Sequence, residues 1–336
     1  MESRGQNSNR LYNISYKNIK GKERYVMKDI EFKDLALEWL SLKKLYIKHS
    51  TYVKYETIVN HHILPYFISF PCYDINNQNI YHFFEIKRNE QLSNSTLNTI
   101  KFILSSIFEY GEENYHLHVM NFKQIKISST HPTKIVLSNE ERDKIIGYVK
   151  NHMQPLSVAL LLSLYGGLRL GEICALQWKH IDLKNKLVHI EGTATRLKCK
   201  ESKTNKTEVI IQTPKSYSSC RYVPLPSFVC HYIESYSKTY NHDHYLLSNC
   251  EKIYEPRRLE KNFYKFCNET GIHCTFHNLR HSYATECVRQ NVEIKTLSEI
   301  LGHSNVSITL NLYIHTSLEQ KQQEIKKLKI PDKFAE

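Results

Sequence analysis

Residues 275–315, with the sequence TFHNLRHSYATECVRQNVEIKTLSEILGHSNVSITLNLYIH, gather side chains suited to one kind of chemistry. Displacement at a phosphodiester needs little covalent help but strong stabilisation of the negative charge that develops. Arginine and histidine side chains supply that stabilisation, and a tyrosine hydroxyl can serve as the nucleophile. The stretch contains His277, Arg280, His303 and Tyr313.

Two cationic residues upstream extend this set. Arg169 follows a Gly-Gly pair in YGGLRLGE, which allows a sharp backbone turn that presents the arginine near the start of a helix. Glu172 follows three residues later on the same helix face, so it can form a salt bridge with Arg169 and orient it. Lys215 lies in PKSYSSCRYVPLP, between Arg169 and the 275–315 stretch.

In this order, the motifs resemble those of the tyrosine recombinases, also called the phage integrase family. A lone H-x-x-R is weak evidence, whereas several motifs in one order are strong evidence. The resemblance is clear over about residues 136–318 and looser over 31–122. The sequence carries G-L-R-x-G-E at 167–172, H-x-L-R-H-[ST]-[FY]-A-T at 277–285, L-G-H at 301–303 and T-x-x-x-Y at 309–313.

The resemblance implies a role for each motif residue. Tyr313 would attack a DNA phosphate, which gives a 3′-phosphotyrosine and a free 5′-hydroxyl. Arg169 and Arg280 would bind the two non-bridging oxygens, and His303 would donate a hydrogen bond to the same oxygens. His277 would assist proton transfer from Tyr313, whose free hydroxyl has a pKa of about 10 and needs activation.

The resemblance also assigns the general acid and implies that no cofactor is needed. The family lysine lies on a hairpin loop, which matches Lys215, and this lysine would protonate the departing 5′ oxygen. Other lysines compete for that role: Lys198, Lys200, Lys203 and Lys206. Arginines and histidines supply the charge that a metal ion supplies elsewhere, and bond energy is conserved, so neither metal nor ATP is expected. The sequence has no G-x-x-x-x-G-K-[ST] motif.

Each motif residue also has an ordinary structural interpretation. Tyr313 is one of 23 tyrosines. His303 could be satisfied by carbonyls at a helix end, and His277 could be a core histidine bonded to backbone. A faint zinc pattern also occurs, but its spacing is irregular and core cysteines explain it better. That pattern consists of Cys267, His273, Cys274 and His277.

Length and charge indicate the class of partner. A chain of 336 residues suggests two compact domains, and a net charge of +12 fits a polyanion better than an anionic membrane. The longest apolar run, 158–165, is too short to span a bilayer, and the amino terminus carries no apolar signal segment. Nine cysteines without C-x-x-C pairs favour a reducing cytoplasm. The composition hints at an AT-rich genome, so we expect the nucleoid of a bacterial host.

The expected fold is mainly α with a small β-sheet. A helical, SAM-like core-binding domain would precede an α/β catalytic domain of the tyrosine recombinase and type IB topoisomerase-like fold. The predicted segments are a flexible basic arm at 1–28, the helical DNA-binding domain at 29–124, a linker at 125–137, the catalytic domain at 138–318, and a charged tail at 319–336. In the family, such a tail often docks into a neighbouring protomer.

Local signals place the elements. Apolar residues at i, i+3 and i+4 from Phe32 predict a first helix. Ser50-Thr51 would cap a second helix that Pro65 ends, a third would run over 74–86, and Ser95-Thr96 would cap a fourth. In the second domain we expect strands at 187–190, 209–213 and 221–225, a helix capped by Ser138, and a left-handed cap at Gly302.

Basic residues outside the motifs are candidates for DNA contact. Their ordinary alternative is a solvated surface, and charge alone does not choose between the two. The same ambiguity applies to the basic 191–214 segment, which resembles the strand insertions of mobile-element integrases. The candidates are Lys43, Lys44, Lys48, Lys54, Lys101, Arg196 and Arg221.

The expected function is site-specific recombination of double-stranded DNA, as in integration or excision of a mobile element. In the family this proceeds in a homotetramer through a Holliday junction, and an excision factor or DNA-bending protein is a further candidate partner. The alternatives are an Xer-like resolvase, a relaxing enzyme like a type IB topoisomerase, and a catalytically silent DNA-binding regulator. The intact motif set disfavours the last.

Overall fold

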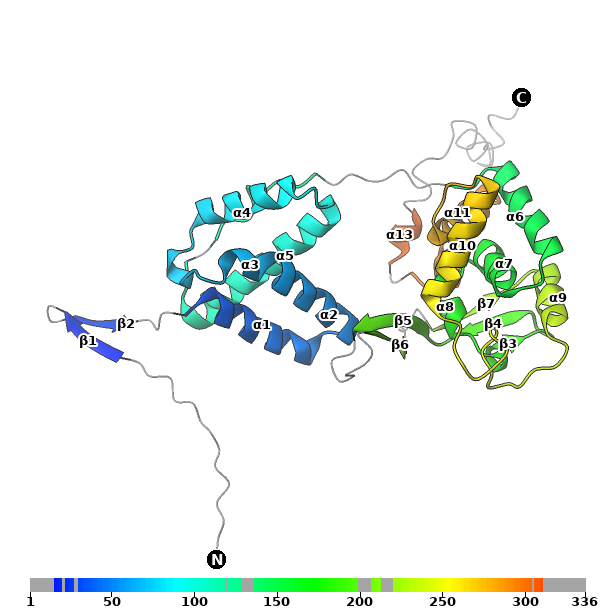
Figure 1. Ribbon diagram of the computed structural model, residues 1–336, viewed down its shortest axis with the longest axis horizontal. Helices are drawn as coiled ribbons and strands as arrows, with labels where there is room; N and C mark the ends of the chain where they lie inside the picture. Colours follow the sequence, from blue (N-terminus) through cyan, green and yellow to red (C-terminus); the bar gives the residue numbers. More distant parts are fainter. Residues whose placement is uncertain are drawn as a thin grey trace, which may run out of the picture. The chain divides into compact units, whose positions relative to one another are not determined.

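The computed structural model describes residues 15–19, 22–26, 30–118, 120–128, 136–198, 207–212, 220–303 and 305–310. The chain divides into two compact units, Met1–Pro132 and Thr133–Glu336, each with its own elements (Figure 1). Both units are built mainly of helices, and the strands are few and short. The expected fold class, mainly α with a small β-sheet, is confirmed. The boundary between the units lies inside the predicted linker.

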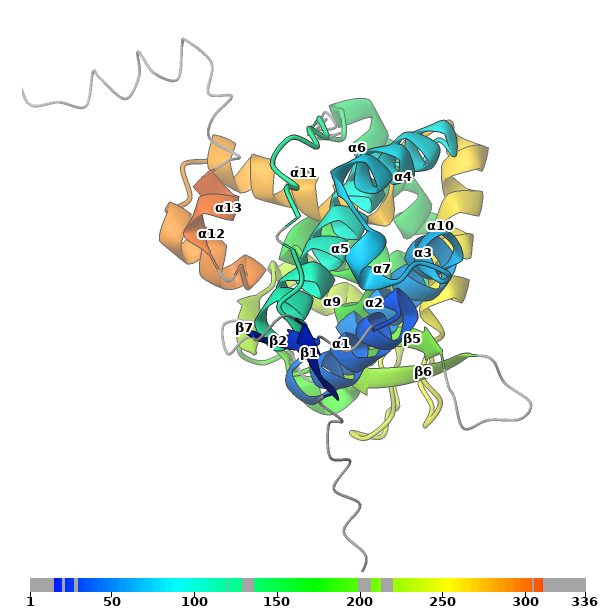
Figure 2. The ribbon, with the colours of Figure 1, turned by 90° about the vertical axis from the view of Figure 1, so that its left-hand side faces the viewer.

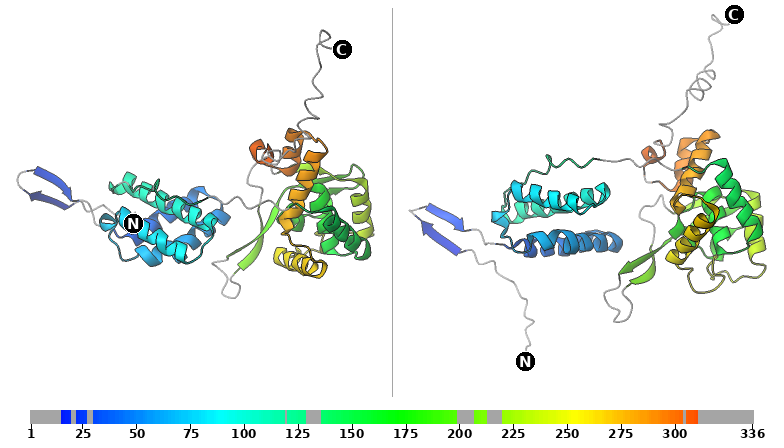
Figure 3. Two further views of the ribbon diagram at one scale, coloured as in Figure 1. Left: turned by 90° about the horizontal axis from the view of Figure 1, so that it is seen from above. Right: turned by 45° about the horizontal axis from the view of Figure 1, so that its top comes forward.

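The described part of the chain begins with a β-hairpin. Strands β1 (Ser15–Ile19) and β2 (Lys22–Val26) pair antiparallel, with Ser15 opposite Val26 (Figure 3). These strands lie within 1–28, where the sequence predicts a basic arm and marks no strands. Tyrosine, isoleucine and valine in the two strands favour extended backbone.

The helices of the first unit form one bundle. Helix α2 continues without a break through a π-helical turn, η1, into α3. The elements are α1 (Phe32–Tyr46), α2 (His49–Ile58), η1 (Val59–Ile63), α3 (Leu64–Phe67), the 3-10 turn η2 (Cys72–Asp74), α4 (Asn77–Asn89) and α5 (Asn94–Tyr115).

Three predicted helix ends in this unit were wrong. Helix α2 begins one residue before the expected Ser50 cap, with Lys48 at the N-cap. Pro65 does not end the helix: it is the second residue of α3 and follows the π-helical turn η1, where the regular α-helical hydrogen-bond spacing is already interrupted. Helix α5 is capped by Ser93, whose Oγ accepts a hydrogen bond of 3.2 Å from the Thr96 N–H.

Aromatic rings fill the core of the first unit. The ring of Phe67 lies 5.0 Å from that of Phe32 and 5.1 Å from that of Phe83, measured between centroids. All three side chains have no exposed surface. Burial of aromatic area on this scale dominates the stability of a small helical bundle.

The second unit is organised around one helix that is apolar on every side, α7 (Pro155–Gly166). A helix of that composition must be surrounded, and α6, α9, α10 and α11 all pack against it. The helices are α6 (Asn139–Asn151), α7, α8 (Leu170–Ala175), the 3-10 turn η3 (Trp178–His180), α9 (Ser227–Tyr236), α10 (Pro256–Thr270), α11 (Phe276–Arg289), α12 (Ile294–Leu301) and α13 (Val306–Leu310).

Two small antiparallel sheets complete this unit. The first has the order β3-β4-β7, with Val188 opposite Val223, and the second is the ribbon β5-β6. The strands are β3 (Ile181–Asp182), β4 (Leu187–Ile190), β5 (Thr193–Lys198), β6 (Thr207–Gln212) and β7 (Arg221–Pro224). The basic segment at 191–214 therefore contains a paired ribbon that projects from the body of the second unit (Figure 3). Among the described residues, no helix is both long and apolar enough to span a membrane.

The buried Phe67 generates a stability prediction. Phe67→Ala should lower the free energy of unfolding by about 3–5 kcal/mol, because it removes a ring from a packed aromatic core. Chemical denaturation followed by circular dichroism would measure the change. Phe102→Ala is the matched control, because that ring is 57% exposed and its loss should cost less than about 0.5 kcal/mol. Equal losses in the two variants would contradict this account of the core.

Candidate active site

The site begins at the turn between α7 and α8. Gly167 ends α7 with a φ of +66°, a conformation that suits glycine. A Cβ there would lie 2.7 Å from the Tyr283 ring, so no side chain fits. Because the turn is sharp, the next residues reverse direction and Arg169 becomes the N-cap residue of α8.

Arg169 and Glu172 form the salt bridge expected from their spacing. Arg169 Nη1 donates to Glu172 Oε1 at 2.7 Å, and the Arg169 backbone N–H donates to Oε2 at 2.9 Å. The arginine side chain is 35% exposed, whereas the carboxylate side chain is 5% exposed. The Arg169 guanidinium is therefore partly exposed to solvent while its ion-pair partner, the Glu172 carboxylate, is buried.

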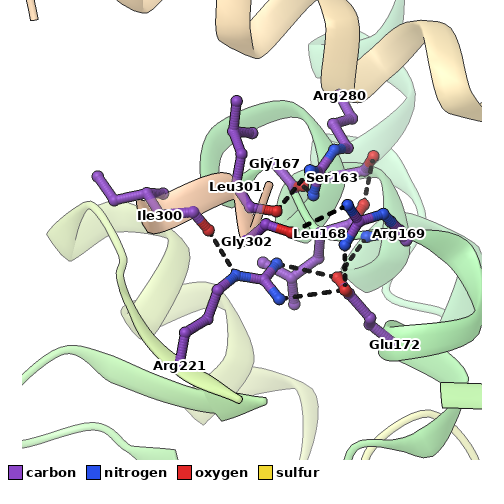
Figure 4. A network of polar contacts seen from close by, with 10 residues as sticks. All are labelled: Ser163, Gly167, Leu168, Arg169, Glu172, Arg221, Arg280, Ile300, Leu301 and Gly302. Atoms are coloured by element: carbon purple, nitrogen blue, oxygen red, sulfur yellow. Dashed lines mark hydrogen bonds and ion pairs between the residues drawn. The ribbon is translucent and has the colours of Figure 1, made fainter. Parts of the chain in front are cut away.

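Arg280 on α11 lies against the same turn from the other side. Its Nη1 donates to the Gly167 carbonyl at 2.6 Å, and its Nη2 donates to the Leu301 carbonyl at 2.5 Å. Burial and the positive charge of Arg169 lower the pKa of Arg280 to about 9, so the group remains charged at neutral pH. One side chain thus joins three segments that are far apart in the sequence (Figure 4).

Arg221 is a correction to the sequence analysis, which placed it among the DNA contacts. It is only 8% exposed and points into the protein from β7. Its Nη1 and Nη2 donate to the two oxygens of Glu172 at 3.1 and 3.0 Å, and its Nε donates to the Ile300 carbonyl at 2.5 Å. A direct contact with DNA is therefore wrong for this residue.

Glu172 is the shared partner of two arginines (Figure 4). Burial alone would raise the pKa of this carboxyl group, but the hydrogen bonds and charge of Arg221, followed by the charge of Arg169, outweigh that effect. The net result is a lowered pKa, so Glu172 is ionised at neutral pH.

His303 follows the end of α12. As predicted, Gly302 is a left-handed cap with a φ of +62°. The His303 Nδ1 lies 2.8 Å from the hydroxyl of Thr309, a fully buried residue of α13. Burial and the charges of Arg280, Arg169 and Arg221 lower the pKa of His303 to about 4. The ring is therefore neutral at pH 7. Helices α11, α12 and α13 lie together at one edge of the unit (Figure 2).

His277 occupies the first turn of α11 and is exposed at one edge. Its ring meets that of His281 edge to face, with centroids 4.5 Å apart. Partial loss of water and the charges of Arg280 and Arg169 lower the pKa of His277. A neutral imidazole next to cationic groups can accept a proton, which fits the expected role in proton transfer.

A cleft of about 430 Å³ opens beside Arg169 and His277. Its wall includes side chains that the sequence analysis missed, Arg257 and Tyr264 of α10, because no motif marks them. Arg196 also lines this cleft, and its Nε donates to Glu255 at 2.9 Å. Two further arginines and an aromatic ring thus stand next to the catalytic candidates.

The structure gathers four of the six predicted catalytic residues, namely Arg169, His277, Arg280 and His303. The other two, Lys215 and Tyr313, lie outside the described residues. Lys43, Lys44, Lys48 and Lys54 lie on or beside α1 and α2 of the first unit, and Lys44, Lys48 and Lys54 are exposed. Lys101 differs, because it is half-buried and its Nζ donates to the Ile125 carbonyl at 2.8 Å.

The faint zinc pattern resolves into ordinary packing. Cys267 and Cys274 are buried with the core of the second unit, and their thiols hydrogen-bond to each other. His277 belongs to the arginine cluster. In the parts of the chain that the structure covers, no group of three or more His, Cys, Asp or Glu side chains is placed to hold a metal ion.

Comparison with known proteins identifies related chains. Residues 136–320 match the phage integrase family, and residues 31–88 match the phage integrase N-terminal SAM-like domain. A tyrosine recombinase XerC-like protein of Caldanaerobacter subterraneus subsp. tengcongensis is 29% identical over 330 residues, which cover 89% of this chain and 83% of that protein. The ICEBs1 integrase of Bacillus subtilis is 24% identical over 311 residues, with 89% and 82% covered.

The fold is also similar to that of solved structures. The Tn1549 transposon integrase in complex with transposon right-end DNA superimposes with a TM-score of 0.74 at 19% identity. The match covers 89% of this chain and 99% of that one. Both units of the present chain therefore have counterparts in one known architecture.

The lowered pKa of His303 predicts a pH dependence of stability. In an unfolded chain a histidine has a pKa of about 6.5, so between that pH and about 4 the unfolded state binds a proton that the folded state excludes. The free energy of unfolding should therefore fall as pH drops through this window. The fall should be smaller in His303→Gln, measured by denaturant unfolding at a series of pH values.

The control for this experiment is His231→Gln, which replaces a histidine that is 81% exposed on α9. It shows how much of the effect comes from replacing any histidine with glutamine. If stability falls with pH as steeply in His303→Gln as in the wild type, His303 is not held neutral in the folded protein.

Proposed function

This chain belongs to the phage integrase family of tyrosine recombinases, and we propose that it cleaves and rejoins DNA with Tyr313 as the nucleophile. The enzyme class follows from the family match, which covers more than half of the chain. The proposal adds the identity of the catalytic residues, the DNA partner and the outcome of the reaction.

One observation carries the assignment of the residues. Arg280 donates to the carbonyls of both Gly167 and Leu301, which brings the turn that bears Arg169 against the turn that bears His303. Arg169, Arg280 and His303 thus come from segments that meet, and the charges of both arginines act on the His303 ring. A phosphate placed there would meet cationic donors that need no rearrangement during the reaction.

We propose the following steps. The Tyr313 hydroxyl attacks the phosphorus while His277 accepts its proton, and the P–O5′ bond breaks. Arg169 and Arg280 stabilise the negative charge on the non-bridging oxygens. In the tautomer in which the Thr309 hydroxyl donates to Nδ1, His303 carries its proton on Nε2 and donates a hydrogen bond to the same oxygens.

Lys215 would protonate the departing 5′ oxygen, so that the products are a 3′-phosphotyrosine and a free 5′-hydroxyl. The reverse attack by a 5′-hydroxyl restores the DNA and the tyrosine. If that hydroxyl comes from a partner duplex, the outcome is strand exchange. The proposed assembly is a homotetramer that passes through a Holliday junction, acting at the bacterial nucleoid.

Two groups of basic residues support double-stranded DNA as the partner. In the second unit, Arg169, Arg196 and Arg257 line one cleft. In the first unit, lysines on α1 and α2 present charge to solvent. We propose that both groups contact phosphates, with the 29–124 and 138–318 segments as the core-binding and catalytic domains. The 319–336 tail would dock into a neighbouring protomer.

A second outcome has support from one comparison. The XerC-like relative matches over most of both chains, so the activity of an Xer-like resolvase is the alternative to integration and excision of a mobile element. Both outcomes use the same covalent chemistry. Mapping the cleaved strand would separate them, because an element end and a resolution site lie in different DNA contexts.

Covalent capture tests the nucleophile. We expect the wild-type chain to form an adduct with nicked duplexes that survives denaturation in SDS. The nick traps the intermediate because the short fragment that carries the free 5′-hydroxyl diffuses away. The duplexes would be enriched from a random-sequence library by binding to the protein. Tyr313→Phe should abolish the adduct and leave binding intact, because the change removes only the hydroxyl. An adduct that persists in Tyr313→Phe would assign the nucleophile to another residue.

Removal of a guanidinium tests charge stabilisation. Arg169→Ala should lower the single-turnover rate of adduct formation by roughly 10²–10³-fold, as loss of one oxyanion donor does in other enzymes. The melting temperature provides the control, because Arg169 is partly exposed and its loss should leave the fold intact. A variant that melts far below the wild type would show that the arginine is mainly structural.

A further inference from the structure

We infer that Arg221 is a positioning residue for the cleavage step, holding both Arg169 and the His303 turn in place from beneath the site. This inference rests on the proposed function. Arg221 does not reach the surface where a phosphate would bind, so it would act only through the residues it touches. No motif of the sequence marks it.

The contact with Glu172 is the first half of the argument. Both oxygens of this carboxylate accept from Arg221, at 3.1 and 3.0 Å, in a paired fork geometry. The same oxygens accept from Arg169 Nη1 and from the Arg169 backbone N–H. Glu172 is therefore held between the buried Arg221 and the catalytic candidate Arg169, and the position of the carboxylate fixes that of the Arg169 guanidinium.

The charge balance gives this clamp a second effect. Two guanidiniums, those of Arg169 and Arg221, bind the Glu172 carboxylate, and the charge of Glu172 also acts on the nearby Arg280. With Arg221 neutralising Glu172, the cluster keeps an excess of positive charge for a phosphate. Without Arg221, the carboxylate would have Arg169 as its main cationic partner. Glu172 would then neutralise the charge of Arg169, and less of that charge would act on the substrate phosphate.

The contact with the end of α12 is the other half. Arg221 Nε donates to the Ile300 carbonyl at 2.5 Å, three residues before His303. A Cβ built on Gly302 would lie 3.0 Å from Arg221 Cδ and Nη1, so the guanidinium stem packs directly under the turn. One side chain thus supports the catalytic arginine on α8 and the turn that carries the catalytic histidine.

Two substitutions separate the parts of this role. Arg221→Met keeps the apolar stem but removes the charge and all donors. Arg221→Lys keeps a cation for Glu172, but a single ammonium cannot form the fork and also reach the Ile300 carbonyl. The lysine variant avoids an unpaired buried carboxylate, so it keeps the test open if Arg221→Met fails to fold.

The matched control is Arg142→Met. Arg142 also joins two helices, because it donates from Nη2 to the Ser282 carbonyl at 3.2 Å and pairs with Glu286 at 3.4 Å. It is 21% exposed, and within the described residues its hydrogen bond and ion pair go to Ser282 and Glu286 of α11 rather than to Glu172 or the His303 turn. The Arg142→Met variant therefore shows how much cleavage activity is lost when a partly buried arginine contact is removed away from the site.

The full chain would be assayed with the enriched nicked duplexes at saturating concentration. Arg221→Met should slow adduct formation by about 10²-fold, the cost of a small misplacement of catalytic groups, while its Kd for DNA changes by less than about twofold. Arg221→Lys should lie between Arg221→Met and the wild type. Arg142→Met should cleave at nearly the wild-type rate even if its melting temperature falls.

A second measurement does not depend on activity. NMR titration of the imidazole of His303 should give a raised pKa in Arg221→Met, because one of the charges that lower this pKa is gone. Arg221→Lys keeps a cation at the position and should show a smaller change. A general loss of stability would not produce this order.

Three results would overturn the inference: wild-type cleavage by Arg221→Met, a rate loss that tracks a matching loss of DNA affinity, or an equal rate loss in Arg142→Met. Failure of the proposed function looks different. In that case the wild type forms no adduct, yet the histidine titration still reports whether Arg221 holds the His303 turn.

Discussion

The buried carboxylate of Glu172 is the interaction on which the site depends. It lies 4% exposed between two arginines from different elements, one on the α7–α8 turn and one on β7. Removing Arg221 would leave this buried carboxylate with only the partly exposed Arg169 as a cationic partner, and a poorly compensated buried charge is costly. The carboxylate therefore depends most on Arg221, which also donates a hydrogen bond to the Ile300 carbonyl at the end of α12.

This arrangement explains how a site with so many like charges can be stable. Arg169, Arg221 and Arg280 repel one another, and burial opposes their ionisation. Backbone carbonyls at Gly167, Ile300 and Leu301 accept from the two more buried arginines, and the carboxylate offsets part of the charge. The remaining positive potential also keeps His303 neutral. Binding of a polyanion would offset the excess positive charge of this cluster.

Sequence reasoning identified the parts of the site that motifs encode. The turn at Gly167 and the left-handed cap at Gly302 both follow from local rules, and the structure contains both. Arg221 was assigned to DNA contact because of its positive charge, without regard to its place in the strand. Side chains of β7 alternate between buried and exposed, and Arg221 is on the buried face with Val223. Strand periodicity alone would have predicted a buried arginine.

Other differences arose where tertiary context decides. Ser93 and Ser95 are both plausible caps, and only the packed position of α5 selects Ser93. A proline inside a helical pattern usually ends the helix, but Pro65 comes just after a π-helical turn, where the α-helical hydrogen-bond spacing is already interrupted. Arg257 and Tyr264 carry no local signal, because their place in the cleft follows from how α10 packs against α7 and α8.

The close packing under Gly302 has a consequence for directed evolution. Every nonsynonymous single-nucleotide change of a glycine codon that does not create a stop codon introduces a Cβ. Here that atom would lie 3.0 Å from the stem of Arg221, in a backbone conformation that already disfavours it. Libraries aimed at new target sequences should keep this codon constant. Positions on the wall of the cleft, such as Arg257 and Tyr264, are better ones to randomise, because they can change without disturbing the buried charges.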